Sequence, residues 1–436
     1  MSEKYKKTKC RYCDSPLGKP FLDLGENHPL ANSLPRPEDL GKPVFTCPLQ
    51  LVKCTHCHLV QLAHAVPAHL MFEDYLYVSS TTKTFREHFA AYAHTVKSKL
   101  GSISSPVAVD IGSNDGLLVS CYMNEGMKAV GVDPAKNLAK QANAEGRPTL
   151  NRYFDETCVA EIIQKYGKAH AISANNVFAH IDDIQSVCRN VFNLLDDEGF
   201  FVIEFPYLVT MLDEMLFDMI YHEHVSYIGV TALNFLMNKY GAHVFDVQRV
   251  SSHGGSLRVF IAKQKSLFQV QPIVGELLEL EKNKGCLSSE VYEKFAARVL
   301  NFKKDLNGLV KKIRDEGKTI WGYGAPAKAT TIINFCELTT SEIENIVDDN
   351  PLKQGRYVPG GPSLSASAPN DANGCIPIVS SSHLEAKTPD FILIFAWNFA
   401  KEIIGKIGHL QNRGVQFIVP LPEPRIVHDH DHALQK

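Results

Sequence analysis

The segment "MIYHEHVSYIG", residues 219–229, carries five side chains that can accept or donate protons: Tyr221, His222, Glu223, His224 and Tyr227. A histidine beside a glutamate is a candidate general base with a carboxylate that orients it or raises its pKa. The alternative is a metal site, but a zinc-binding helix needs two histidines four residues apart, whereas His222 and His224 are two apart. The spacing favours proton transfer and leaves either histidine as the base.

Other side chains of the same kind are expected near this segment. "NNVFAHID" places His180 after a predicted strand, and "YLYVSS" places Tyr75 and Tyr77 before a predicted helix. Each histidine alone could be a buried structural residue. Gathered on one rim of a sheet, they favour a site for proton transfer.

A second candidate site is the turn "DIGSNDG", which follows an apolar run. Glycines let the backbone approach a ligand closely, and the third glycine of the dinucleotide fingerprint is missing. Carboxylates in the turn would repel a pyrophosphate, so a cationic or zwitterionic ligand such as S-adenosylmethionine is favoured over a dinucleotide. A purely structural turn is the alternative. The candidate cofactor-binding residues are Asp110, Gly112, Asn114, Asp115, Gly116, Asp133 at the end of the next strand, and Asn175.

A third candidate site is the second glycine-rich turn, "WGYGAPAK", which lies between a predicted strand and a predicted helix. It contains Gly322, Gly324 and the cation Lys328. Backbone N–H groups at a helix start together with a lysine can bind a pyrophosphate, so a nucleotide-linked substrate is one interpretation. A structural turn is the other.

Two "CxxC" pairs near the N-terminus predict a zinc site with four thiolate ligands, since each short spacing directs two thiolates toward one tetrahedral ion. Cys47, His56 and His58 are possible substitute ligands. A filled four-cysteine site has no open position, so the metal is expected to stabilise the fold and not to catalyse. The predicted ligands are Cys10, Cys13, Cys54 and Cys57.

These residues must be positioned by an α/β fold. A helix is predicted over 80–100, followed by strands within 106–116, 128–135, 147–154, 168–176 and 198–207 and by two strands within 242–264. Alternating strands and helices predict a doubly wound, mostly parallel sheet with an antiparallel edge. Residues 270–318 are helix-rich, and a second Rossmann-like alternation begins at 318. We expect a small zinc-binding domain (1–72), a Rossmann-like domain (73–265) and a second, C-terminal Rossmann-like domain (266–436).

Composition excludes several classes of function. The 436 residues include 45 Lys+Arg and 48 Asp+Glu without a long basic run, so the electrostatic footprint of a nucleic-acid-binding protein is missing. No stretch approaches the ~20 apolar residues of a membrane span, and the charged N-terminus is unlike a signal peptide. The expectation is a cytoplasmic protein with reduced thiols, a monomer or a homodimer.

The order of several motifs resembles one enzyme family. "CRYC", "CTHC", "DIGSNDG", "GVDPA", "YHEHVSY", "HGGSLRVF", "GYGAPAK", "DDNPLKQGRYVPG" and "IVPLPEPR" are similar to motifs of the zinc-containing sugar C-methyltransferases of deoxysugar biosynthesis. The likeness spans nearly the whole chain. It implies that 1–72 is a zinc-binding domain, 73–265 a class I Rossmann-like methyltransferase domain and 266–436 a Rossmann-like sugar-nucleotide-binding domain. It implies that S-adenosylmethionine methylates C-3 of a nucleotide-linked 4-keto-6-deoxyhexose, through an enolate that the 4-keto group stabilises.

The resemblance also assigns roles to residues. It implies His224 as general base, Glu223 as its orienting or proton-relaying partner, Tyr221 and His180 as groups that hold the sugar or the enolate oxygen, and Tyr75 as part of the pocket wall. The candidate substrate-binding residues are Tyr77, His222, Gly322, Gly324, Lys328 and Arg356.

One departure from the family pattern is the long link "PGGPSLSASAPNDANGCIPI", expected to be a mobile surface loop, which bears on domain closure and on the nucleotide accepted. The tail "VHDHDHALQK" is expected to be a disordered terminus. The alternatives are a related methyltransferase acting on another acidified carbon or on oxygen, a nicotinamide-dependent sugar oxidoreductase, and a non-catalytic zinc- and nucleotide-binding protein. The sequence does not determine which nucleotide the substrate carries, or whether C-3 of the sugar bears a hydroxyl or an amine group.

Overall fold

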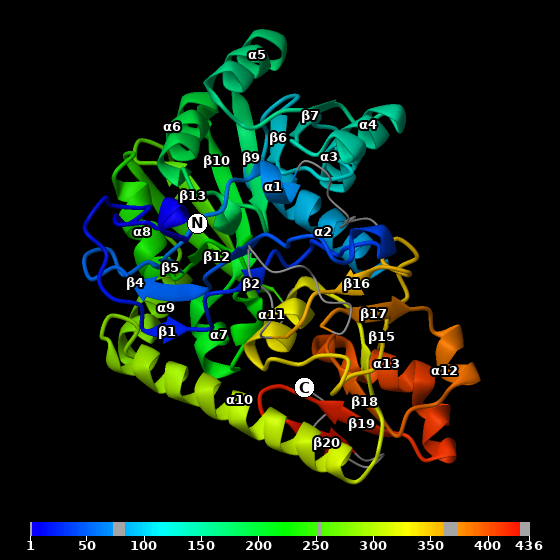
Figure 1. Cartoon of the computed structure of the whole chain (residues 1–436). Helices are drawn as coiled ribbons and strands as arrows, with labels where there is room; N and C mark the ends of the chain where they lie inside the picture. Colours follow the sequence, from blue (N-terminus) through cyan, green and yellow to red (C-terminus); the bar gives the residue numbers. More distant parts are fainter. Residues whose placement is uncertain (1, 73–82, 251–254, 362–373, 428–436) are drawn as a thin grey trace.

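The computed structural model describes residues 2–72, 83–250, 255–361 and 374–427. Tyr75, Tyr77, most of the long link after residue 361 and the histidine-containing tail lie outside these ranges. Within them, no helix is long and apolar enough to cross a membrane. The chain forms an N-terminal unit (2–72), a central unit (83–250 and 255–263) and a C-terminal unit (318–361 and 374–427), which Figure 1 shows packed side by side.

The N-terminal unit contains a small antiparallel sheet that is completed by a strand from the central unit. Its strands are β1 (Leu22–Asp23), β4 (Gln50–Lys53) and β5 (Val60–Leu62), and β11 (Ser226–Tyr227) pairs with β5 to give the order β1-β4-β5-β11. A second pair joins β2 (His28–Pro29) to β3 (Thr46–Cys47). The candidate segment around His224 is therefore tied to the N-terminal unit by backbone hydrogen bonds.

The central unit has the predicted doubly wound sheet. Its strand order is β12-β13-β10-β9-β6-β7-β8, in which β8, β7, β6, β9 and β10 are parallel and β13 is antiparallel to both neighbours. The predicted hairpin forms the antiparallel edge: β12, at the edge, pairs antiparallel with β13, which lies between β12 and β10. The bounds are β6 (Val107–Ile111), β7 (Lys128–Val132), β8 (Thr149–Leu150), β9 (Ala169–Asn175), β10 (Leu195–Pro206), β12 (Ala242–Val250) and β13 (Ser256–Lys263).

Helices cover both faces of this sheet because successive strand residues point to opposite sides. Val107, Val109 and Ile111 pack on one face, in the core that includes α5 (Glu156–Tyr166) and α6 (Ile184–Leu194). Ala108 packs on the other face, with α2 (Lys83–Leu100) and α3 (Leu117–Asn124). The remaining helices of this unit are α4 (Lys136–Ala144), α7 (Leu208–Asp213) and α8 (Val230–Asn238).

Two helices connect the central and C-terminal units. The first is α9 (Pro272–Asn283), whose buried Glu281 accepts hydrogen bonds from Val230 N and Thr231 N at the start of α8 and from the Tyr207 hydroxyl. The second is the long helix α10 (Glu290–Asp315), which contacts α7, β1 and β14 (Ile320–Tyr323) and so touches all three units. In Figure 1 it runs along the lower edge of the molecule.

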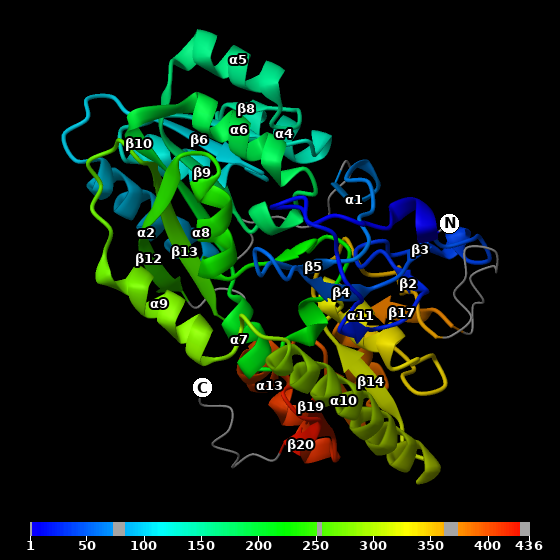
Figure 2. The same cartoon turned by 90° about the vertical axis from the view of Figure 1, so that its left-hand side faces the viewer.

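The C-terminal unit is a second Rossmann-like sheet, ordered β16-β17-β15-β14-β18-β19-β20, with antiparallel strands only at its two edges. Its helix α11 (Ala327–Phe335) contacts β2 and the short helix η5 (Phe217–Met219) of the central unit, and Figures 1 and 2 both place it beside the N-terminal unit. The other elements are β14 (Ile320–Tyr323), β15 (Ile346–Val347), β16 (Tyr357–Val358), β17 (Ile376–Val379), α12 (Ser382–Ala386), β18 (Phe391–Ile394), α13 (Ala400–Ile407), β19 (Gln416–Val419) and β20 (Arg425–Val427).

Candidate functional site

Residues 218–228 form hydrogen bonds with all three units of the chain. The carbonyl of Ile220 accepts from the Thr331 hydroxyl of α11, and the carbonyl of Val225 accepts from Leu62 N of β5. The carbonyl of Ile228 accepts from Leu208 N, where α7 begins. These contacts come from the C-terminal, N-terminal and central units, so the candidate site lies where the three units meet.

His224 is oriented by both of its ring nitrogens. Nδ1 lies 2.8 Å from the carbonyl oxygen of Met219, and Nε2 lies 3.0 Å from the Tyr221 hydroxyl. A carbonyl can only accept, so Nδ1 carries the proton in the neutral ring and Nε2 accepts from Tyr221. His224 is 9% exposed and lines a small cavity with Met211, Ser226 and other mostly apolar residues. Nε2 is therefore presented as a proton acceptor.

His180 and Tyr221 flank this ring, as the sequence suggested. The centroids of the His180 and His224 rings are 5.0 Å apart, and those of the Tyr221 and His224 rings are 4.1 Å apart. His180 ends the short helix η4 (Phe178–His180) after β9 and stacks on Phe72, with ring centroids 5.7 Å apart. Histidine and tyrosine side chains are thus clustered around one potential base.

His222 lies apart from this cluster. Its Nε2 donates to the carbonyl oxygen of Cys47, 3.0 Å away in the N-terminal unit, and its ring is 1% exposed. Burial lowers its pKa to about 3, so the ring stays neutral near pH 7. The structure therefore brings His224, and not His222, into the group with Tyr221 and His180.

Glu223 is contacted by a residue that sequence reasoning missed. The Asn32 side chain of the N-terminal unit donates from Nδ2 to Glu223 Oε1 at 2.5 Å. Asn32 stands in "PLANS", which has no spacing or composition typical of a site. Only the tertiary fold brings the two residues together.

The turn after β6 combines glycines with acidic groups at the carboxyl ends of the strands. Gly112 has a φ of +68°, and a Cβ there would lie 2.8 Å from Val177, so the turn needs glycine. Asp133 accepts from Asn114 N at 2.7 Å and from Ala135 N at 2.8 Å, which joins the first two turns of the sheet. This is the edge where open α/β sheets bind ligands.

Other predicted residues of this turn differ in their surroundings. Burial raises the pKa of Asp110 to about 7, although a hydrogen bond from the Ser173 hydroxyl opposes the rise. The carbonyl of Asp115 accepts from Arg147, and Gly116 precedes α3 with a φ of +76°. The amide of Asn175, at the end of β9, has buried oxygen and nitrogen atoms without a hydrogen-bond partner among the described residues. Such an amide fits a polar ligand at this edge.

The second glycine-rich turn is occupied by its own neighbours. Ala325 N donates to Asp348 Oδ2 at 2.7 Å, and Lys353 donates to the carbonyl of Ala325 at 2.8 Å. Gly322 and Gly324 are packed against Phe395 and Ala396, which leave no room for a Cβ. The backbone of this turn is thus bound within the C-terminal unit.

The two predicted cations of the C-terminal unit reach toward the other units. Lys328 Nζ lies 3.1 Å from Asn398 Oδ1 and 3.9 Å from the buried carboxylate of Asp218. Arg356 donates to the carbonyls of Leu352 and Leu34, the latter in the N-terminal unit. Both cations contribute to contacts between chain segments.

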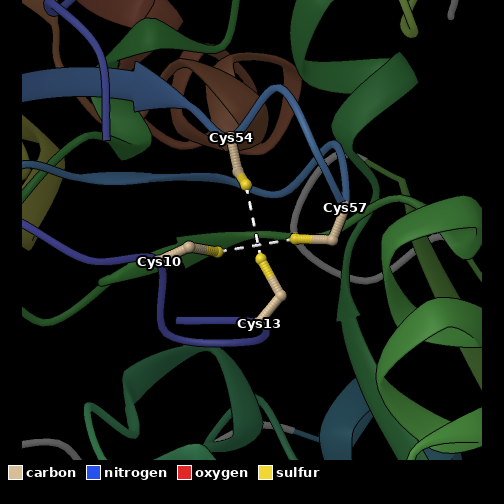
Figure 3. A group of neighbouring side chains, drawn as sticks. All are labelled: Cys10, Cys13, Cys54 and Cys57. Atoms are coloured by element: carbon tan, nitrogen blue, oxygen red, sulfur yellow. Dashed lines mark hydrogen bonds between the residues drawn. The ribbon is translucent and has the colours of Figure 1, made fainter. Parts of the chain in front are cut away.

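The four predicted cysteines form one cluster. Their sulfur atoms lie within 4.8 Å of one another, with Cys10 and Cys57 3.4 Å apart and Cys13 and Cys54 3.5 Å apart. Zinc–sulfur bonds of about 2.3 Å in a tetrahedron require sulfur–sulfur distances of about 3.8 Å. Figure 3 shows the four thiols directed at a common centre.

The possible substitute ligands are not part of this cluster. Among the described residues, only the four cysteines group as ligands around one centre. Burial raises the pKa of the Cys47 thiol to about 12, so it remains protonated. The cysteine cluster fits a structural zinc ion.

Three family models match successive parts of the chain. Residues 10–72 match the family described as "Putative zinc binding domain", residues 85–247 match "Methyltransferase domain", and residues 251–422 match "C-methyltransferase C-terminal domain". A curated relative, C-methyltransferase NovU of Streptomyces niveus, is 34% identical over 418 residues, which cover 96% of each chain.

Solved structures give weaker matches. Magnesium protoporphyrin IX methyltransferase of Synechocystis is 13% identical, with a TM-score of 0.32 over 42% of this chain and 89% of that one. An S-adenosylmethionine-dependent methyltransferase of Clostridium acetobutylicum is 11% identical, with a TM-score of 0.34 over 41% and 92%. At these scores neither structure bears on the reaction.

Replacing one zinc ligand should destabilise the protein without affecting the rest of the site directly. We expect Cys54→Ser to lower the bound zinc below one ion per chain and to lower the midpoint of thermal unfolding, because metal binding free energy is folding free energy here. Cys121→Ser, outside the cluster, is the control and should keep its zinc. Elemental analysis and calorimetry measure both effects, and a Cys54→Ser protein with full zinc and unchanged stability would contradict the assignment.

The burial of His222 predicts a pH dependence of stability. The unfolded chain takes up a proton on this ring below pH 6.5, whereas the folded chain does so only near pH 3, so stability is lost as the pH falls between these values. The loss from this residue is about 2 kcal/mol between pH 6.5 and 5.

His222→Gln isolates this contribution, because glutamine can donate to the Cys47 carbonyl but does not titrate. Between pH 6.5 and 5 the variant should lose about 2 kcal/mol less stability than the unchanged protein, measured by denaturant unfolding. Buried His28, with a pKa lowered to about 4, stays in both proteins, and the exposed His94→Gln is the control. Equal losses in both proteins would show that His222 is not the buried neutral group described.

Proposed function

This chain belongs to the zinc-containing, S-adenosylmethionine-dependent C-methyltransferases, and from that membership we propose that it methylates C-3 of a nucleotide-linked 4-keto-6-deoxyhexose. The predicted fold class, the cofactor and the structural zinc are confirmed. A nicotinamide-dependent oxidoreductase and a non-catalytic binding protein are no longer needed as alternatives. The proposed identity of the substrate rests on the motif resemblance described above and on the chemistry of the site.

Methyl transfer to carbon requires a carbon nucleophile, and this requirement carries the proposal. A carbon next to a carbonyl group becomes nucleophilic when a base removes its proton. The observation that supports such a base is the pairing of His224 Nδ1 with the Met219 carbonyl, which leaves Nε2 as the acceptor. S-adenosylmethionine, when bound, supplies an electrophilic methyl group.

In the proposed reaction, the Tyr221 hydroxyl turns from His224 Nε2 to the sugar, which frees the lone pair of Nε2. Nε2 then takes the C-3 proton of the 4-keto sugar, and the electron pair of the broken C–H bond forms the enolate. Tyr221 and His180 would stabilise the enolate oxygen or hold the sugar, since both flank the His224 ring. Glu223 would orient the base or relay its proton. Tyr75, outside the described residues, is proposed for the pocket wall.

The other site assignments are proposals of the same kind. Asp110, Gly112, Asn114, Asp115, Gly116, Asp133 and Asn175 would bind the cofactor, and the orphaned Asn175 amide and the glycine turn support this. Lys328 would exchange its Asn398 contact for a substrate phosphate. The proposed substrate-binding residues also include Gly322, Gly324, Arg356, Tyr77 and His222. Arg356 and His222 would act indirectly, through their hydrogen bonds to the carbonyls of Leu34 and Cys47 in the N-terminal unit. The proposed domains are 1–72, 73–265 and 266–436.

A substrate panel tests the proposed function. TDP-, GDP- and CDP-linked 4-keto-6-deoxyhexoses, with a hydroxyl or an amine at C-3, are incubated with the enzyme and S-adenosylmethionine. Mass spectrometry should find a product that has gained one CH2 group, and NMR should place the new methyl on C-3. A methyl group on oxygen or on another carbon would support the related-methyltransferase alternative, and no product from any sugar would overturn the proposal.

His224→Ala tests the base. We expect methylation to fall by about 10²–10⁴-fold, because a positioned general base contributes that much. Exchange of the C-3 hydrogen with D2O should fall in parallel, while calorimetry should find the affinity for S-adenosylhomocysteine unchanged. His222→Gln tests the other histidine of the motif and should retain exchange, because glutamine can keep the hydrogen bond to the Cys47 carbonyl. If exchange persists undiminished in His224→Ala, another group removes the proton.

A further inference from the structure

The N-terminal unit contributes a side chain to the proposed catalytic group. Asn32 Nδ2 donates to Glu223 Oε1 at 2.5 Å, across 191 residues of sequence. Glu223 is 4% exposed, and Asn32 is half-buried. Because Glu223 stands between His222 and His224, this contact reaches the centre of the "YHEH" motif.

The backbone that carries Asn32 is fixed by the C-terminal unit. The Thr330 hydroxyl of α11 donates to the carbonyl of Ala31 at 3.0 Å. Arg356 donates to the carbonyl of Leu34 at 3.3 Å, and Tyr357 N donates to the carbonyl of Pro35 at 2.9 Å. Asn32 is therefore presented to Glu223 from a segment that is anchored on both sides of it.

An amide is suited to holding a catalytic carboxylate. Its N–H group favours the charged form of the carboxylate and fixes its plane, and it adds no charge to the site. A lysine or arginine at this place would pair with Glu223 and oppose protonation of the neighbouring His224. The amide thus orients Glu223 while leaving the charge of the site to the residues of the "YHEH" motif.

We propose that Asn32 is a positioning residue for Glu223 in methyl transfer, supplied by the N-terminal unit. This inference rests on the proposed function. It gives the N-terminal unit a part in the reaction besides zinc binding, since the folding that the zinc ion supports also places Asn32.

A double-mutant cycle tests whether Asn32 acts through Glu223. Asn32→Ala should lower kcat about tenfold, the size of one lost hydrogen bond to a charged group, with KM and the affinity for S-adenosylhomocysteine unchanged. In the Glu223→Ala background the same change should have no further effect on kcat. Ser33→Ala, at an exposed neighbour, is the matched control and should keep full activity. Losses that multiply in the double variant would overturn the proposal.

Asn32→Asp supplies a readout that a structural role would not move. A second carboxylate beside Glu223 favours uptake of a proton by the pair, so the acidic limb of the kcat profile should shift to higher pH by about one unit. Asn32→Ala should lower the profile without this shift. An unshifted Asn32→Asp profile would contradict electrostatic contact between the two side chains.

Thermal unfolding of the four proteins of the cycle, without substrate, separates this test from that of the proposed function. If Asn32 stabilises the protein only through Glu223, the double variant should have the same midpoint temperature of unfolding as the less stable single variant. Additive shifts would overturn the link, whether or not any sugar of the panel is methylated.

Discussion

The pairing of β11 with β5 is the constraint on which the candidate site depends. Ser226 and Tyr227 lie opposite Gln61 and Val60, and Leu62 N binds the carbonyl of Val225, so the end of the "YHEHVSY" motif is fixed as a strand of the N-terminal sheet. Upstream, Thr331 holds the carbonyl of Ile220. With both ends fixed, the two histidines between them have different surroundings. His222 is buried against Cys47 of the N-terminal unit, and His224 lines the cavity beside α7 and η5.

The features that the sequence predicted depend on residues that lie close together in the chain. Paired cysteines two residues apart, glycines at turns that need positive φ, and acids at strand ends have short-range causes, so the cysteine cluster, the turn at Gly112 and the position of Asp133 follow from spacing. The apolar run Val107–Ile111 likewise predicts a strand buried on both faces. The contacts that decide the site are non-local. Asn32 lies in a segment without a motif, β11 is two residues long, and the partners of Lys328 are more than 65 residues away, so no periodicity could reveal them.

In both Rossmann-like units an aspartate after the second strand accepts hydrogen bonds from backbone N–H groups of two turns. In the central unit, Asp133 follows the second strand and accepts from Asn114 N in the first turn and from Ala135 N in its own turn. In the C-terminal unit, Asp348 accepts from Ala325 N in the first turn and from Asn350 N in its own. The second unit adds Lys353, which binds the carbonyl of Ala325 and closes the turn on itself. In the central unit the buried Asn175 amide at these strand ends has no hydrogen-bond partner among the described residues, whereas in the C-terminal unit the turn is closed on itself and α11 contacts the neighbouring units.

The late completion of the N-terminal sheet has a consequence for biosynthesis. The ribosome releases β1, β4 and β5 long before residues 226 and 227 are made, so β5 is at first an edge strand whose free N–H and C=O groups can pair with another chain. The closing strand comes from the central unit after its fifth parallel strand, β10, so the edge stays open while most of that sheet is synthesised. A nascent chain thus passes through a stage at which β1, β4 and β5, still without β11, are a template for aggregation. Early zinc binding cannot end that stage, because the missing strand is supplied by a different unit.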